Sequence, residues 1–310
     1  MNVFDLLKAA LLGLVEGVTE WLPISSTGHM ILVDEFVKLS VSEEFWNMFL
    51  VVIQLGAILS VCVLYFHDLN PLSPRKSADE RRATWTLWGK IVVGCLPAAL
   101  IGLPLNDFMD EHFYNPYVVA VALVVYGVAF IVIERRRAGR RAAVVASAPA
   151  RGRHFASTVG TTGAADDADF GAITSVDDIS WKTAFGIGCF QVLSLVPGTS
   201  RSGSTIIGGL LLGTTRSVAA RFTFFLAIPV MFGASLLKVV KFLLGGAAMG
   251  PNEWGVMAVG LVVAFGTSLV AIRWLTGFVR RHDFKAFGWY RIVLGALVLV
   301  YFLVVAPVLG

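Results

Sequence analysis

Charged side chains are scarce in this chain. Only 15% of its 310 residues are Asp, Glu, Lys or Arg, whereas 56% are hydrophobic, and the mean hydropathy is +0.76. Soluble domains carry about 25% charged residues, so the composition excludes an ordinary soluble domain. Apolar runs long enough to cross a bilayer recur at 45–66, 88–105, 117–133, 222–244, 254–274 and 289–306. We therefore expect an all-α polytopic membrane protein.

Cysteines and basic clusters are also few. Cys62, Cys95 and Cys189 lie in apolar segments without the spacing of a metal site, which indicates packed thiols. The net charge of +4 comes from basic residues scattered over separate loops, so nucleic acid is not an expected partner. The first apolar run has no basic start and contains two glutamates, which is atypical of a cleavable signal peptide.

One polar stretch, residues 16–29, interrupts the apolar N-terminal region. Its carboxylates, Glu16 and Glu20, are four residues apart and share one face of a helix. Pro23 ends that helix, and the hydroxyl residues after it are good N-caps for a second one. A helix N-terminus attracts anions, and ionisable groups at membrane depth mark functional sites. The stretch therefore predicts an anion site with a cation between the anion and the carboxylates.

A second polar stretch, residues 197–205, follows another apolar segment. Arg201 at a membrane-buried break needs an anion, and its planar fork suits phosphate. Ser200, Ser202, Ser204 and Thr205 add hydroxyl donors. When Pro23 is set on Pro197 without gaps, the two polar stretches align, and three apolar runs follow each. These features predict an internal repeat.

Basic loops predict how the two halves sit in the membrane. Lys and Arg concentrate in 67–87, 134–153 and 273–285, which places these loops in the cytoplasm and loops 106–115 and 245–253 outside. The first helical hairpin then enters from outside and the second from the cytoplasm. We therefore expect two inverted repeats, each a re-entrant hairpin plus three transmembrane helices, with a ligand site where the repeats meet.

The same pattern divides the chain into three parts. Residues 1–133 form the first membrane repeat and residues 181–310 the second. Between them, residues 134–180 contain almost no large apolar side chains, and we predict a flexible cytoplasmic linker.

The polar residues allow several chemical roles. Glu16 and Glu20 suit a divalent cation shared with phosphate, Ser26 a nucleophile or phosphate donor, and His29 a general acid or base. Simpler alternatives are a water-filled vestibule, helix packing by small residues, a structural histidine and a structural ion pair between Glu20 and Arg201. Gln54 and Gln191 are interpreted as supporting or packing residues.

The two polar stretches resemble those of the undecaprenyl-pyrophosphate phosphatase family of bacterial integral membrane enzymes, also known for bacitracin resistance. The likeness is carried by Glu16-Gly-Val-Thr-Glu20, Pro23-Ile-Ser-Ser-Thr-Gly-His29 and Pro197-Gly-Thr-Ser-Arg201-Ser-Gly-Ser-Thr205, and it extends over nearly the whole chain. The departure is residues 138–178, a segment that most members lack.

The resemblance implies hydrolysis of undecaprenyl pyrophosphate to the lipid carrier of cell-wall synthesis in the plasma membrane. It also implies a homodimer, dependence on Mg²⁺ or Ca²⁺, and an active site open to the outer face. By this likeness Glu16 and Glu20 would hold the metal, and the catalytic residues would be Glu20, Ser26, His29 and Arg201. The pyrophosphate would be bound by Ser25, Thr27, Ser200, Arg201, Ser202 and Thr205.

Three other functions fit parts of the pattern. A secondary transporter is the main rival, since inverted repeats with broken helices are common in transporters. A lipid-phosphate phosphatase of the other membrane class is disfavoured because the next histidine after Arg201 is His282. A Ser–His intramembrane protease would leave Arg201 and the paired glutamates without a role.

Overall fold

The computed structural model describes residues 2–147 and 173–305. Over these ranges the chain is helical, and its sheet-like pairing is limited to one parallel bridge between Ile173 and Thr214. The elements are α1 (Val3–Thr19), α2 (Ser26–Phe36), α3 (Glu43–Leu64), α4 (Phe66–Leu69), α5 (Ala78–Phe113), α6 (Pro116–Ser147), α8 (Trp181–Val192), the 3₁₀ turn η1 (Leu193–Leu195), α9 (Arg201–Leu211), α10 (Arg216–Leu244), α11 (Pro251–Val279), α12 (Lys285–Val300) and the π-helical turn η2 (Tyr301–Val305).

Six of the described helices are long and apolar enough to cross a membrane. They are α3, α5, α6, α10, α11 and α12 with η2. Each contains all or most of one of the apolar runs in the sequence, so the prediction of an all-α polytopic membrane protein is confirmed.

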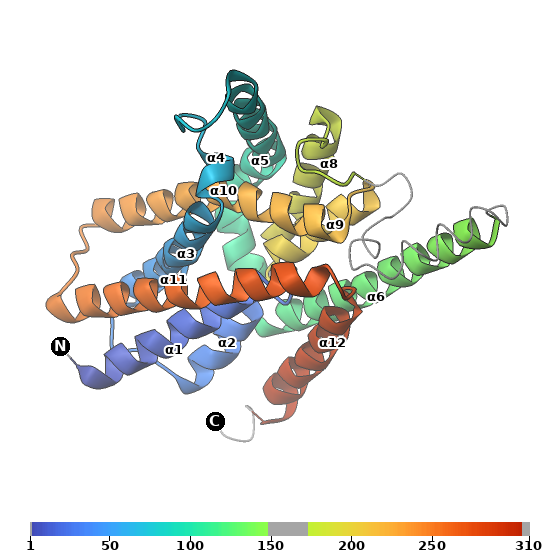
Figure 1. The fold of residues 1–310 in the computed structure, drawn as a ribbon. Coiled ribbons are helices and arrows are strands. Elements are labelled where there is room, and N and C mark those ends of the chain that lie inside the picture. Colours follow the sequence, from blue (N-terminus) through green and yellow to red (C-terminus); the bar gives the residue numbers. More distant parts are fainter. Residues whose placement is uncertain (1, 148–172, 306–310) are drawn as a thin grey trace.

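Two pairs of shorter helices are each interrupted by a short segment that is not α-helical, as the sequence predicts. Residues 20–25, the first elbow, separate α1 from α2, and residues 193–200, the second elbow, separate α8 from α9. In Figure 1, α1 lies beside α11 while α8 lies beside α5, so each hairpin packs against the other half of the chain. Because each hairpin packs against the other half, the two elbows lie close together.

Glycines allow the close approach of these helices. A Cβ on Gly13 of α1 would overlap the carbonyl oxygen of Gly260 in α11, and a Cβ on Gly188 of α8 would overlap that of Gly94 in α5. The two hairpins are thus held through the same kind of contact. Backbones that touch in this way pack well in a membrane, where close van der Waals contact drives helix association.

Each of five buried or capping residues in the first hairpin has an equivalent in the second hairpin, always at the same distance along the sequence. The pairs are Ala9 and Ala184, Leu12 and Ile187, Gly13 and Gly188, Glu16 and Gln191, and Ser25 and Ser200. The structure therefore supports an internal repeat. The gap-free alignment of the two prolines is wrong by one residue, because the second elbow has one more residue between its proline and the capping serine. The inverted orientation of the halves stays a prediction.

The predicted linker is shorter than expected at both ends. Helix α6 continues to Ser147, and its buried Glu134 pairs with Arg216 at 2.7 Å. Near the other end, Val176 and Ile179 are buried in the core. The segments 134–147 and 173–180 are therefore structured, contrary to the prediction, and residues 148–172 lie outside the described residues.

Most of the segment 106–115, predicted to be a loop, is helical instead. It forms the last turns of α5, which runs without interruption to Phe113 despite Pro97 and Pro104 within it. Here helical packing overrides the local preference of proline to end a helix.

Candidate active site

The two elbows end in the same local structure. Ser25 caps α2 and Ser200 caps α9, and the Oγ of each accepts a hydrogen bond from the backbone N–H three residues later, on Gly28 and Gly203. Both serines have positive φ, 72° and 69°, which is uncommon outside glycine. Such backbone strain persists where the surroundings fix it, and it clusters at functional sites.

Each cap leaves backbone donors free at the helix start. Within the described parts of the chain, the N–H groups of Ser26 and Thr27 on α2 and of Arg201 and Ser202 on α9 have no hydrogen-bond partner. The first N–H groups of a helix lack intrahelical partners and, with the helix dipole, favour an anion. Two helix N-termini of this kind meet at one place.

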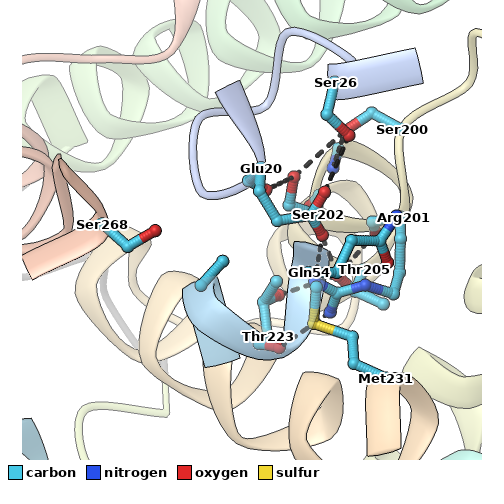
Figure 2. A network of polar contacts seen from close by, with 12 residues as sticks. Glu20, Ser26, Gln54, Ser200, Arg201, Ser202, Thr205, Thr223, Met231 and Ser268 are labelled. Atoms are coloured by element: carbon cyan, nitrogen blue, oxygen red, sulfur yellow. Dashed lines mark hydrogen bonds and ion pairs between the residues drawn. The ribbon is translucent and has the colours of Figure 1, made fainter. Parts of the chain in front are cut away.

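Glu20 connects the two elbows. One carboxylate oxygen, Oε1, accepts a hydrogen bond from Arg201 Nη2 at 2.8 Å, and the other, Oε2, accepts from Ser26 Oγ at 2.7 Å. Glu20 is 7% exposed, and the Arg201 side chain is 12% exposed. Figure 2 shows these contacts converging from opposite sides. A hydroxyl bonded to a carboxylate, beside a guanidinium, is an arrangement that can activate an oxygen nucleophile near an anion.

Further contacts hold Arg201 and its neighbours in place. Arg201 Nη1 donates to the carbonyl of Thr223 at 3.4 Å, and Nη2 lies 3.9 Å from the sulfur of Met231. Ser202 Oγ lies within hydrogen-bonding distance of the carbonyl of Glu20, at 3.1 Å, and of Ser200 Oγ, at 3.0 Å. The two elbows are therefore joined through side chains and backbone alike (Figure 2).

A pocket of about 140 Å³ lies between the elbows. It is far larger than the volume of one water molecule, about 30 Å³. Its polar lining is contributed by both halves of the chain: Glu20, Ser26, Thr27, Gln54, Ser194, Ser200, Arg201 and Ser202. Six residues predicted for the site line it, and so does Gln54, which the sequence suggested only as a supporting residue.

The other predicted site residues lie near the pocket but do not line it. Ser25 acts as the N-cap of α2. Glu16 is 1% exposed behind Glu20, and its Oε1 has no partner among the described residues. Thr205 is buried and bonds to the carbonyl of Arg201 and to Thr223.

His29 points away from the Glu20–Ser26 pair. Its Nδ1 lies 2.7 Å from the carbonyl of Ser25, and its Nε2 lies 2.7 Å from the hydroxyl of Tyr290, on which its ring also stacks. Because a carbonyl can only accept, Nδ1 carries the proton, and Nε2 of the neutral ring accepts from Tyr290. Both ring nitrogens are thus engaged outside the pocket.

Sequence reasoning missed Arg291. It lies inside the apolar run at 289–306, whose pattern indicated only a membrane span, yet it is fully buried and bonds to backbone of both elbows. An arginine within a membrane span is itself a signal of function, and this signal was available in the sequence.

An apolar groove adjoins the pocket. With a volume of about 480 Å³, it is lined by Phe113, Tyr117, Val118, Val121, Ala122, Val125, Tyr126, Leu193, Val196 and Thr199. Val196 of the second elbow lines both the groove and the polar pocket. The elbow therefore places an apolar surface next to the polar one.

Comparison with known proteins gives matches over nearly the full chain. A family model described as bacitracin resistance protein BacA matches residues 9–297, nearly the full chain. The chain belongs to the BacA family. Curated relatives named undecaprenyl-diphosphatase include those of Limosilactobacillus fermentum, 51% identical over 98% of this chain and 100% of the relative, and of Enterococcus faecalis, 50% identical over 96% and 98%. The relative from Streptococcus agalactiae is 51% identical over 98% and 99%.

The donor set fits a divalent cation in this BacA-family site. The described residues contain no cluster of three or more His, Cys, Asp or Glu side chains, so protein ligands alone do not enclose a metal. However, Mg²⁺ is commonly held by one or two carboxylates plus substrate phosphates. The unpartnered Oε1 of Glu16, one helical turn from Glu20, supplies the kind of oxygen that such an ion takes.

Proposed function

We propose that this chain hydrolyses undecaprenyl pyrophosphate to undecaprenyl phosphate and inorganic phosphate in the bacterial membrane, and that the pocket between the elbows is where it does so. Membership of the BacA family and relatives of about 50% identity over nearly the full length support the activity. The observation that supports the site is the meeting of Glu20 and Ser26 from one half with Arg201 from the other.

The pyrophosphate would bind where the two helix N-termini meet. The free N–H groups of α2 and α9 and the hydroxyls of Thr27, Ser200 and Ser202 offer donors on several sides. Arg201 has five N–H donors, not all of which are used by Glu20, Thr223 and Met231, so it can also bind a phosphate oxygen. Fixed donors in a low-dielectric site stabilise the charge that develops on a transferring phosphoryl group.

In this proposal Ser26 would attack the terminal phosphorus. Glu20 Oε2 would accept the Ser26 proton as the Oγ–P bond forms and the bond from phosphorus to the bridging oxygen breaks, releasing undecaprenyl phosphate. Water would then attack the phosphoserine, and protonated Glu20 would return its proton to Oγ as the P–Oγ bond breaks, giving inorganic phosphate and free Ser26. A nucleophile bonded to its base at this distance is the usual sign of such a role.

Glu16 and Glu20 would hold Mg²⁺ or Ca²⁺ together with phosphate oxygens. When bound, such an ion neutralises phosphate charge beside the two carboxylates. Glu16 would otherwise leave a buried carboxylate oxygen without a partner, which is costly.

The prenyl chain would lie in the apolar groove beside the second elbow. From Tyr117 to Tyr126 the groove follows α6 for about 13 Å at 1.5 Å per residue, close to half of a hydrocarbon core about 30 Å thick. With the start of α6 on the outer side, as the basic loops predict, the substrate would enter from the outer leaflet. The inverted arrangement of the repeats and a homodimer belong to this proposal.

The main test is phosphate release by purified protein. Undecaprenyl and shorter prenyl pyrophosphates are supplied with Mg²⁺, with Ca²⁺ and with EDTA, and the same protein is reconstituted in vesicles for a lipid flux assay. We expect phosphate release that EDTA abolishes and added metal restores. Flux of intact lipid pyrophosphate without phosphate release would favour the transporter alternative and overturn the proposal.

A further inference from the structure

Arg291 of α12 contacts the backbone of both elbows. Its Nη1 donates to the carbonyl of Pro23 in the first elbow at 3.1 Å. Its Nη2 donates to the carbonyls of Gly198, at 2.8 Å, and Thr199, at 2.9 Å, in the second elbow. A single side chain thus connects two segments that come from opposite halves of the chain.

This arginine has an unusual environment. It is fully buried, and its guanidinium stands 5.5 Å from the ring centre of Tyr126. Within residues 2–147 and 173–305 it forms no salt bridge, and its Nε has no partner. A buried charge normally requires a paired carboxylate or a dense set of hydrogen bonds. Here three backbone carbonyls and an aromatic ring provide the compensation.

The three carbonyls lie where helical hydrogen bonding is interrupted. Backbone that leaves the helix inside a membrane must find its partners elsewhere in the protein. The planar fork of arginine presents several N–H groups in fixed directions, which a lysine ammonium does not. Arg291 is therefore suited to hold two non-helical segments at one relative position.

Holding these carbonyls also orients the donors that follow them. In a trans peptide the C=O of one residue and the N–H of the next point in opposite directions. The bond from Arg291 to the carbonyl of Thr199 therefore fixes the direction of the N–H of Ser200, a residue that lines the pocket. Arg291 itself does not line the pocket, so its influence on a bound anion is indirect.

We propose that Arg291 is the positioning residue that sets the two elbows against each other, so that the N-termini of α2 and α9 and the Glu20–Ser26–Arg201 group share one phosphate-binding geometry. The proposal rests on the proposed function for its catalytic consequence. The structural consequence, that both elbows are ordered together by α12, does not depend on any activity.

Arg291→Met and Arg291→Lys test the proposal. We expect Arg291→Met to lower kcat for prenyl pyrophosphate by about 10²-fold, the loss that a misplacement of about 1 Å produces, with less than about threefold change in KM. KM should change little because Arg201 still attracts the anion. Lysine keeps the positive charge and N–H donors of Arg291 but lacks the planar fork. We therefore expect Arg291→Lys to have a higher kcat than Arg291→Met, a lower kcat than the unaltered protein, and again little change in KM.

The second measurement is amide hydrogen exchange on the same proteins. Arg291→Met should raise exchange in peptides covering both elbows, residues 20–27 and 193–202, without a comparable rise in α3. The matched control is Arg216→Met. Unlike Arg291, Arg216 bonds to a carboxylate, that of Glu134, and it lies at the opposite end of α9 from the second elbow. This control should lower thermal stability without raising exchange in the elbows selectively.

The outcomes separate the two proposals. Normal kcat in well-folded Arg291→Met protein, or elbow exchange no greater than in Arg216→Met, would overturn the role of Arg291. Absence of phosphate release by the unaltered protein would instead overturn the proposed function, while the exchange measurement would still decide the role of Arg291. Where Arg291→Met does not fold, Arg291→Lys provides both measurements.

Discussion

The carboxylate of Glu20 and the guanidinium of Arg201, 181 residues apart in the chain, meet at 2.8 Å between the two elbows. The same carboxylate accepts a hydrogen bond from the hydroxyl of Ser26 at 2.7 Å. Neither half of the chain contains all three groups, so the proposed phosphatase site exists only when the two hairpins pack together. The pair is also the structural ion pair that the sequence left as an alternative, and mutations distinguish the two roles.

Arg201→Lys and Glu20→Gln should each lower turnover by roughly 10²-fold, the loss expected when one preorganised electrostatic group is removed. Lysine keeps the charge of Arg201 but not the planar fork, and glutamine keeps the shape of Glu20 but not its charge. Only Glu20→Gln should raise the Mg²⁺ concentration required for half-maximal activity. Titration of activity with Mg²⁺ measures both effects. Near-normal phosphate release by both variants, with normal thermal stability, would leave the ion pair a structural role only.

Ser26→Ala should nearly abolish phosphate release if the hydroxyl attacks phosphorus. Thr27→Val is the matched control, because Thr27 lines the same pocket but its hydroxyl is not bonded to Glu20. We expect the control to lose less activity, mainly through a higher KM. Rapid quenching with substrate labelled in the terminal phosphate should trap label on Ser26 in the unaltered protein. Retention of a tenth or more of the turnover by Ser26→Ala would favour attack by water.

Tyr290→Phe should have a smaller effect than His29→Ala. Phenylalanine keeps the ring that stacks on His29 and removes only the hydroxyl that bonds Nε2. Alanine at position 29 also removes the contact with the carbonyl of Ser25, the residue that caps α2. We expect a loss of about threefold for Tyr290→Phe, which removes one neutral hydrogen bond. We expect a loss of at least about tenfold for His29→Ala, which removes two hydrogen bonds and the stacked ring. Equal losses, with altered pH profiles of kcat in both, would instead indicate proton transfer through Tyr290.

Glu134→Gln should destabilise the fold without altering the chemistry. Glu134 is 1% exposed, bonds Arg216 through both oxygens and accepts the backbone N–H of Phe284. Loss of one partner of a buried pair costs about 3–5 kcal/mol, whereas an exposed pair is worth about 0–1 kcal/mol. Lys285→Gln, which breaks the part-exposed pair with Asp283, is the control. In detergent, the thermal unfolding temperature of Glu134→Gln should be well below that of Lys285→Gln, and the reverse order would contradict this account.

Gly139→Cys and Glu111→Cys test the predicted orientation in a background without Cys62, Cys95 and Cys189. Both positions are exposed, and Gly139 has open space where a side chain would stand. Because basic loops remain in the cytoplasm, a thiol at 139 should be protected from an impermeant reagent in intact cells, and one at 111 should be labelled. Labelling at 139 with protection at 111 would reverse the orientation.

The sequence by itself determined the all-α, membrane-spanning class of the fold and most of the polar lining of the pocket. Apolar runs of about twenty residues cross a membrane as helices, since lipid offers no partner to backbone groups, and helices cover all or most of each of the six. The breaks at Pro23 and Pro197 were visible because proline and capping serines are local signals. Six pocket residues were identified because ionisable and polar side chains are costly at membrane depth and therefore mark a functional site there.

Only the tertiary structure decided how these groups are arranged. Three contacts join residues far apart in the chain: Glu20 with Arg201, His29 with Tyr290, and Arg291 of α12 with the first elbow. The burial of Glu134 in α6, at the start of the predicted linker, is of the same kind, because Arg216 and the backbone N–H of Phe284 satisfy its carboxylate. Composition and periodicity report whether a residue prefers helix or lipid. They do not report its partner, because a distant partner leaves no local pattern in the sequence.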